Sequence, residues 1–259
     1  MKASDAFHNA RKIGIWTLRI PIYGLAYYLA HAALNRPAFP GVGRILNAIV
    51  RDVLPGFAVH LPATIIRWFL VYVLGLALGL LGGVLIGYFR RLHEAVKFEV
   101  DFFRSLPATV LVVFILAAFG DGHIQRSLPA FYITFFTVLF YVAKHMAMLK
   151  RTRIEHLVDL GASRAFILRH CVYYELLPVI MVASRQAISL SFLVAISVEL
   201  IVGSYGNVGL GKLLYDWKFY TNYSDIIGGL IVIGGIGYAL NLAMLKLHRK
   251  MVPWHNIET

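Results

Sequence analysis

The sequence has a single cysteine, Cys171, so it can form neither an intramolecular disulfide nor a metal site built from a cysteine cluster. Charge is also scarce: only 15% of the 259 residues are Asp, Glu, Lys or Arg. The 13 acidic residues stand against 25 Lys and Arg, which gives a formal net charge of +12. These basic residues form short groups between apolar runs and no continuous stripe, which argues against a nucleic-acid-binding protein. Gly and Pro form no low-complexity tract, so disorder is excluded as well.

What the chain has instead is long apolar runs, since 59% of its residues are hydrophobic. A helix needs about 20 apolar residues to cross a bilayer, and about six segments satisfy this length. We expect spans near Ile13–Leu34, Leu61–Phe89, Phe98–Phe119, Leu128–Met148, Val179–Val202 and Ile226–Leu247. The first run is interrupted by Arg19 and Pro21 and no small-residue cleavage site follows it, so we expect a retained helix rather than a signal peptide. The sequence predicts an all-α polytopic membrane protein.

The connecting segments predict the orientation. If the N-terminus is cytoplasmic, the inside segments hold most of the Lys and Arg residues, with large groups around Arg90 and Lys150. The outside segments then hold only Arg36, Arg44, Arg51, Arg126, Lys212 and Lys218. The positive-inside rule therefore predicts that both termini are cytoplasmic.

Glycines at positions 75, 79, 83 and 87 form one stripe along the second predicted span. Small residues at this spacing let helix backbones approach closely. Close packing within one subunit is the simpler interpretation, and a subunit interface or a sliding contact is the alternative.

The longest predicted inside segment, between the fourth and fifth spans, has the pattern of a broken amphipathic helix. Gly161 predicts the stop of a first helix and Ser163 the N-cap of a second. A helix lying on the membrane surface would have a similar pattern.

The order of residues in this segment is more specific than its periodicity. Glu155, then Gly161-Ala162-Ser163-Arg164, then Leu177-Pro178 resembles the EAA loop of ABC-importer permeases, in which Glu-Ala-Ala precedes a Gly and a Leu-Pro closes the segment. Other stretches also look like that family: residues 38–46, Arg67, 104–107, 118–120, Glu199, 209–211 and 252–255. The resemblance covers nearly the whole chain and is closest to the nitrate/sulfonate/taurine type.

The chain departs from the family pattern at several positions. His156 and Leu157 stand where the family usually has two alanines, and Tyr174 where an extra Pro is common. Gly83 replaces a frequent Pro. Bulkier residues at a close-packed contact indicate a partner groove adapted to them.

The resemblance implies one permease domain over residues 1–259, with an N-terminal helix and external segment at 1–60, a core at 61–250 and a coupling loop at 151–178. It implies a subunit of an ATP-driven importer for a small anion or organic acid such as nitrate, a sulfonate or taurine. The coupling loop would contact the ATPase through Glu155, His156, Leu157, Gly161, Ala162, Ser163 and Arg164.

The same resemblance implies the surroundings of the chain. The expected partners are a second permease copy, two cytoplasmic ATP-binding subunits, an external solute-binding protein and the lipid of a bacterial inner membrane. The chain itself would be no enzyme and would bind no cofactor, because ATP and Mg²⁺ belong to the ATPase.

An ionisable group within a membrane span is costly and indicates function. Glu199, Arg67 and Arg104 are therefore candidates for the translocation path, and Ser197, a polar residue of the same span as Glu199, is a further candidate. Polar packing of Glu199 near the outer interface, and arginines that extend to the membrane surface, are the alternatives. No two histidines lie three or four residues apart, so a helical metal site has no support.

Three other functions are less compatible with the sequence. Residues 206–213 have most of a phosphate-loop pattern but lack its Ser/Thr and follow no soluble strand. An intramembrane serine protease needs a sequestered Ser and His, whereas Ser163 sits among cytosolic arginines. An ion-coupled secondary carrier would favour inverted repeats, and the two halves show no evident repeat.

Overall fold

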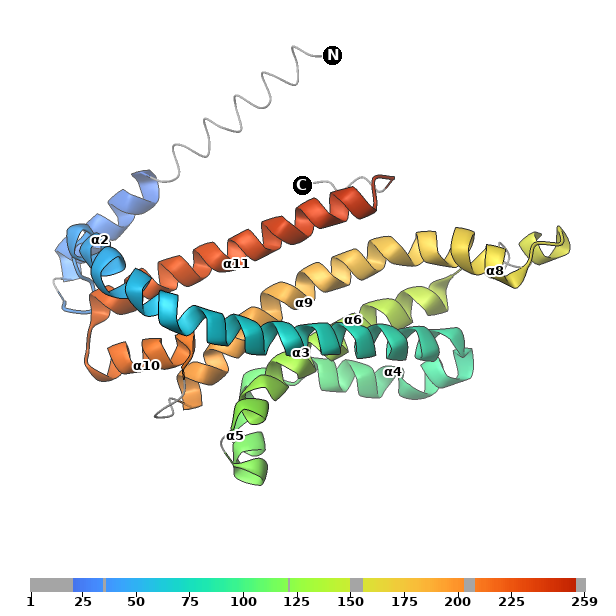
Figure 1. Ribbon diagram of the computed structural model, residues 1–259, viewed down its shortest axis with the longest axis horizontal. Coiled ribbons are helices and arrows are strands. Elements are labelled where there is room, and N and C mark those ends of the chain that lie inside the picture. Colours follow the sequence, from blue (N-terminus) through green and yellow to red (C-terminus); the bar gives the residue numbers. More distant parts are fainter. Residues whose placement is uncertain (1–20, 35, 121, 150–155, 203–207, 255–259) are drawn as a thin grey trace, which may run out of the picture. The chain divides into compact units, whose positions relative to one another are not determined.

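A computed structural model describes residues 21–34, 36–120, 122–149, 156–202 and 208–254, which are almost entirely helical and contain no strand. A helix over residues 21–34 precedes the labelled elements of Figure 1. These are α2 (Val42–Ala48), the π-helical η1 (Ile49–Val53), α3 (Leu54–Tyr88), α4 (Arg90–Ser105), α5 (Ala108–Phe119), α6 (His123–Met148), α8 (Arg164–Ile167), the π-helical η2 (Leu168–Val172), α9 (Tyr173–Val202), α10 (Leu210–Phe219) and α11 (Tyr223–Met251). The predicted all-α fold is confirmed.

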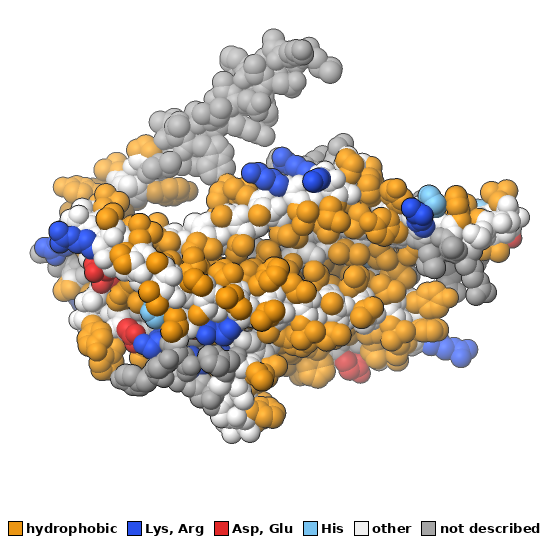
Figure 2. All heavy atoms as spheres, viewed as in Figure 1, with side chains coloured by type: hydrophobic (Ala, Val, Ile, Leu, Met, Phe, Trp, Pro, Cys, Tyr) orange, Lys and Arg blue, Asp and Glu red, His pale blue; other side chains and the backbone are white. Residues whose placement is uncertain are grey.

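Within the described residues, four helical stretches are long and apolar enough to cross a membrane: Val42–Tyr88, Ile124–Met148, Tyr173–Val202 and Tyr223–Met251. The helices α4 and α5 together would make a fifth span. The first predicted span, Ile13–Leu34, lies partly outside the described residues. Figure 2 shows hydrophobic side chains over much of the visible surface, as expected for helices that face lipid.

The expectation of one helix over Phe98–Phe119 is wrong. The chain bends by 88° between α4 and α5. Leu106, which precedes Pro107, is extended at φ −67° and ψ 131°. The proline ring disfavours helical geometry in the residue before it, so the helix stops there.

The residues group into two compact units, Met1–Gly56 with Asp216–Ile231, and Phe57–Tyr215 with Val232–Thr259. In the first unit, the Tyr27 hydroxyl donates to the Pro40 carbonyl oxygen at 2.8 Å. Gly228 of α11 packs there against η1, because a Cβ at Gly228 would lie 2.9 Å from Ile49 Cγ1. The first contact holds the helix over residues 21–34 to the segment before α2, and the second holds the start of α11 against η1.

In the second unit, the glycine stripe of α3 packs against α6. A Cβ at Gly79 would lie 2.8 Å from the Phe135 carbonyl oxygen, and one at Gly83 would lie 2.8 Å from Val142 Cβ. Gly75 and Gly87 are equally close to α6. The interpretation of the stripe as close packing within one subunit is therefore confirmed, because any side chain would push these two helices apart.

The helix α9 supplies most of the remaining core of this unit. Trp68 of α3 donates its indole N–H to Ser191 Oγ at 2.9 Å and packs edge-on against Phe192, with the ring centroids 5.3 Å apart. Tyr72, one turn further along α3, donates to the Ser184 carbonyl oxygen at 3.2 Å. The polar tips of these aromatic side chains thus find partners in the apolar interior.

Candidate functional site

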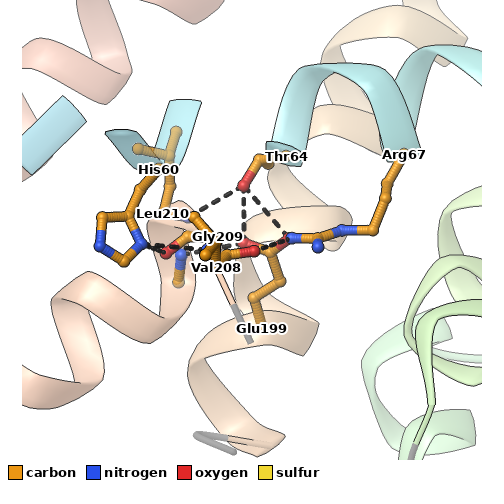
Figure 3. Close-up of polar contacts among 8 residues, drawn as sticks. His60, Thr64, Arg67, Glu199, Val208, Gly209 and Leu210 are labelled. Carbon is orange, nitrogen blue, oxygen red and sulfur yellow. Dashed lines mark hydrogen bonds and ion pairs between the residues drawn. The ribbon is translucent and has the colours of Figure 1, made fainter. Parts of the chain in front are cut away.

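The first candidate site is a polar network that joins α3, α9 and the start of α10. His60, Thr64 and Arg67 lie four and three residues apart on α3, so they share one face of that helix. Glu199 faces them from the last turn of α9 (Figure 3). Residues 208–211 lie between the two helices and lead into α10 (Figure 3).

The carboxylate of Glu199 is the centre of this network. It accepts hydrogen bonds from Arg67 Nη2 at 2.5 Å, from Thr64 Oγ1 at 2.9 Å and from the Gly211 N–H at 3.1 Å. Glu199 is only 4% exposed. A buried carboxylate is tolerated only when it is paired and hydrogen-bonded, and this one has both forms of compensation.

The same face of α3 satisfies the first N–H groups of α10. The Gly209 N–H donates to His60 Nδ1 at 3.0 Å, and the Leu210 N–H donates to Thr64 Oγ1 at 2.9 Å. Together with the bond from Gly211 to Glu199, three successive N–H groups find side-chain partners on other helices. A helix start ordinarily leaves such groups unsatisfied, so these contacts fix where α10 begins.

Glycine is required in this segment for reasons of space. A Cβ at Gly209 would lie 2.5 Å from Glu199 Oε2 and 2.7 Å from Arg67 Nη2. A Cβ at Gly211 would lie 2.5 Å from the Leu200 nitrogen. Gly209 and Gly211 are therefore the positions where the backbone of this segment packs directly against the Arg67–Glu199 ion pair.

The network has little room for a ligand. A cavity of about 10 Å³ lies beside it, lined among others by Arg67, Arg126 and Glu199. That is about the space of one water molecule. The arrangement can hold α10 against α3 and α9, and it leaves no space for a solute of several atoms.

The fold brings only two of the four predicted path residues together. Arg67 and Glu199 form an ion pair at 2.5 Å. Arg104 lies on α4, with its guanidinium 4.0 Å from the centroid of the Phe140 ring. Ser197 lies on α9 and is partly exposed. Sequence reasoning missed His60 and Thr64, whose signal is polar side chains spaced on the face of α3 that also carries Arg67.

The second candidate site is the predicted coupling segment. Glu155 lies outside the described residues, and a short helix covers residues 156–159, including His156 and Leu157. The Gly161 N–H donates to the Val158 carbonyl oxygen and the Ala162 N–H to that of Leu157, both at 2.9 Å. Gly161 has φ +79°. This pair of bonds around a left-handed glycine is a Schellman motif, so the predicted helix stop is confirmed.

The next helix of the coupling segment begins at Arg164. Ser163 Oγ accepts a hydrogen bond from the Phe166 N–H at 3.3 Å, and the Ser163 carbonyl oxygen accepts one from the Ile167 N–H at 3.0 Å. The predicted N-cap is therefore confirmed. The result is a helix, a tight turn and a second helix, all defined by backbone hydrogen bonds.

Large apolar side chains project from this turn. Leu160 is 83% exposed, and Val158 and Phe166 are about half exposed. Exposed apolar groups on a polar, basic connecting segment are typical of a protein-binding surface. The sequence pattern does not single out Leu160, because the exposure of this side chain depends on where the chain turns.

No group of three or more His, Cys, Asp or Glu side chains could hold a metal ion within the described ranges.

Comparison with known proteins gives the family. Residues 75–254 match the model of the binding-protein-dependent transport system inner membrane component. The chain is 24% identical to the taurine transport system permease protein TauC of Escherichia coli (strain K12), covering 76% of this chain and 70% of that protein. It is 28% identical to the bicarbonate transport system permease protein CmpB of Synechococcus elongatus, covering 66% and 61% respectively.

A solved structure shares the fold. A chain from the inward facing conformations of the MetNI methionine ABC transporter superposes with a TM-score of 0.60 at 19% identity, covering 76% of this chain and 97% of that chain. The family match includes the glycine stripe, the coupling segment and Glu199. The chain belongs to the family of inner-membrane components of binding-protein-dependent transport systems, and it is a transport permease.

Proposed function

We propose that this chain forms the translocation path of an ATP-driven importer for a small oxyanion or organic acid. The observation that carries the proposal is the turn at Gly161, which is closed by backbone hydrogen bonds and has exposed apolar side chains. A short stiff element passes a rigid-body motion of a partner to the helices on either side of it. The turn therefore receives the ATPase subunit.

The proposed assembly is supported by the family and by the chain's composition. Two copies of the permease enclose the path, two cytoplasmic ATPase subunits bind the coupling segments, and a solute-binding protein delivers solute from outside. ATP and Mg²⁺ are bound by the ATPase subunits. Both termini lie in the cytoplasm, as the distribution of Lys and Arg predicts.

The solute class is supported by two relatives. Taurine and bicarbonate, named in the descriptions of these relatives, are small and carry an anionic group. The excess of basic over acidic residues in the present chain is compatible with an anion. Arg104 and Ser197 remain candidates for the path, whereas Arg67 and Glu199 hold α10.

Copurification tests the coupling role. The complex is isolated from native membranes and its ATPase activity is compared between the wild type and Gly161→Ala. A Cβ at φ +79° is strained by about 1 kcal/mol or more, so the turn should distort and solute-stimulated ATPase activity should fall severalfold. Gly234→Ala is the matched control, because Gly234 lies in α11 with open space around it.

Two results would overturn this function. The first is equal ATPase activity in both variants and the wild type. The second is a chain that purifies without any ATPase and moves solute down an ion gradient, which would make it a secondary carrier. The solute class is tested separately, by competition of taurine, an alkyl sulfonate and bicarbonate for transport in the reconstituted complex.

A further inference from the structure

A second polar region lies in a pocket between the ends of α3, α4 and α6. The pocket has a volume of about 220 Å³. Its apolar wall is formed by Ile86, Val100, Phe140 and Ala143. Ligand sites for drug-sized molecules usually measure about 300–1,000 Å³, so this pocket suits a smaller group.

The ionisable side chains of the pocket are mostly basic. His93 and Lys97 lie one turn apart on α4, Asp101 follows one turn later, and Lys144 faces them from α6. Lys97 Nζ is 2.5 Å from Glu94, and Arg104 is 3.7 Å from Asp101. Asp101, the acidic residue that lines the pocket, is therefore paired with Arg104, and Lys97 is paired with Glu94, which lies outside the pocket lining.

Two groups of the pocket have no such partner. Within the described part of the chain, Lys144 has no carboxylate at ion-pair distance and lies 5.6 Å from the centroid of the Phe140 ring. His93 Nδ1 is buried and has no hydrogen-bond partner. A buried polar nitrogen without a partner is costly, whereas the Lys144 side chain is exposed and its ammonium is available to an anion. An oxyanion in the pocket would pair with Lys144 and lie beside the His93 ring, which lines the pocket.

The pocket lies at the end of α3 that leads into Arg90 and Arg91, which is the predicted cytoplasmic side. Basic pockets between membrane helices on that side are suited to anionic groups, either a lipid headgroup or a free anion. The apolar wall beside the basic groups suits the organic part of such a molecule.

We propose that His93, Lys97 and Lys144 form a binding site for an oxyanion, a phosphate, sulfonate or carboxylate group, at the cytoplasmic ends of α4 and α6. Lys144 supplies the positive charge that has no carboxylate partner, Lys97 adds a second cation beside it, and the His93 ring lines the site. This site is separate from the network around Glu199 and from the coupling turn, and it does not depend on which solute is transported.

The test uses the full chain in nanodiscs of phosphatidylcholine. Inorganic phosphate is titrated calorimetrically, and retention of phosphatidylglycerol is measured by native mass spectrometry at increasing lipid fractions. Lys144→Gln removes the unpaired charge, and Val100→Phe fills the pocket without changing any charge. Lys246→Gln is the matched control, since Lys246 is exposed on α11, outside the pocket and on the same predicted side.

Each variant has a definite expected result. Lys144→Gln and Val100→Phe should weaken binding at least tenfold, or about 1.4 kcal/mol, while Lys246→Gln leaves it unchanged. If Lys144→Gln and Val100→Phe abolish the phosphate isotherm, the ligand is a free anion. If the two variants lower only the retention of phosphatidylglycerol, the ligand is a lipid headgroup. Absence of both kinds of binding in the wild type, or an equal loss in Lys246→Gln, would overturn the proposal and leave only general surface attraction.

Discussion

The network around Glu199 and the turn around Gly161 hold short segments in place by different means. The network uses buried side chains from α3 and α9 that bind the start of α10. The turn uses backbone hydrogen bonds and a left-handed glycine, and it leaves Leu160 exposed. A segment fixed by side chains has little surface left for a partner, whereas one fixed by its own backbone can present its side chains to another protein. We expect mutations in the first region to change stability and mutations in the second to change association.

Glu199→Gln should have the largest effect on stability. The substitution keeps the size of the side chain but leaves the partly buried Arg67 guanidinium without its carboxylate. Breaking a buried pair by removing one partner costs about 3 kcal/mol or more, so the midpoint of denaturant unfolding in detergent should fall clearly. Glu94→Gln is the control, because Glu94 and Lys97 form an exposed pair on α4, and no measurable change is expected there. Equal midpoints for the two variants would show that the ion pair does not stabilise the fold.

Gly211→Ala should have the next largest effect. The new methyl group would lie 2.5 Å from the Leu200 nitrogen, within the backbone of α9, so either α10 or α9 must shift. Forcing a methyl group into such a contact costs about 1–3 kcal/mol. Thermal unfolding of the purified chain measures the loss, and Gly234→Ala should show none because its surroundings are open. A Gly211→Ala chain as stable as the wild type would mean that α10 is not held at this position.

Thr64→Val should have a smaller effect in the same network. The hydroxyl of Thr64 donates to Glu199 and accepts from the Leu210 N–H, so valine removes both bonds and leaves a buried N–H group unsatisfied. The expected cost is about 1–3 kcal/mol, in the lower part of that range because Arg67 still pairs with Glu199. Hydrogen exchange at Leu210 should become faster than at Ile233 in the middle of α11. Unchanged protection of Leu210 would mean that the close packing of Gly209 and Gly211 fixes the start of α10 without the Thr64 hydroxyl.

The fold could be predicted from the sequence to the level of its apolar helices. Long apolar runs must form helices in lipid, because every backbone polar group needs a partner. The sequence does not predict the break at Pro107. A proline alone is not a sufficient signal, because Pro62 and Pro178 lie inside continuous helices. A proline in the interior of a helix weakens it, and tertiary contacts decide whether the helix breaks there.

The sites show the same division between local and long-range information. The helix stop at Gly161 and the cap at Ser163 depend on neighbouring residues, so the sequence predicted both correctly. The contact between Arg67 and Glu199 joins residues that are 132 positions apart. Each was found alone as an unusual charge in an apolar run, but their pairing depends on how α3 and α9 pack. The contribution of Thr64 was missed for the same reason.

Leu160→Ala should have the smallest effect on stability and a large one on association. The side chain is 83% exposed, so its removal takes few contacts from the folded chain and should change the unfolding free energy by less than about 0.5 kcal/mol. If the turn docks into a groove of the ATPase, the same substitution removes a buried anchor of that interface, and retention of the ATPase on the immobilised permease should fall about tenfold. Leu230→Ala is the control, since Leu230 is also an exposed leucine and belongs to α11 rather than to the coupling segment. Normal ATPase retention by Leu160→Ala would exclude this side chain as an anchor. If Leu160→Ala lowered the unfolding free energy as much as Glu199→Gln does, the turn would be held by its side chains, as the Glu199 network is.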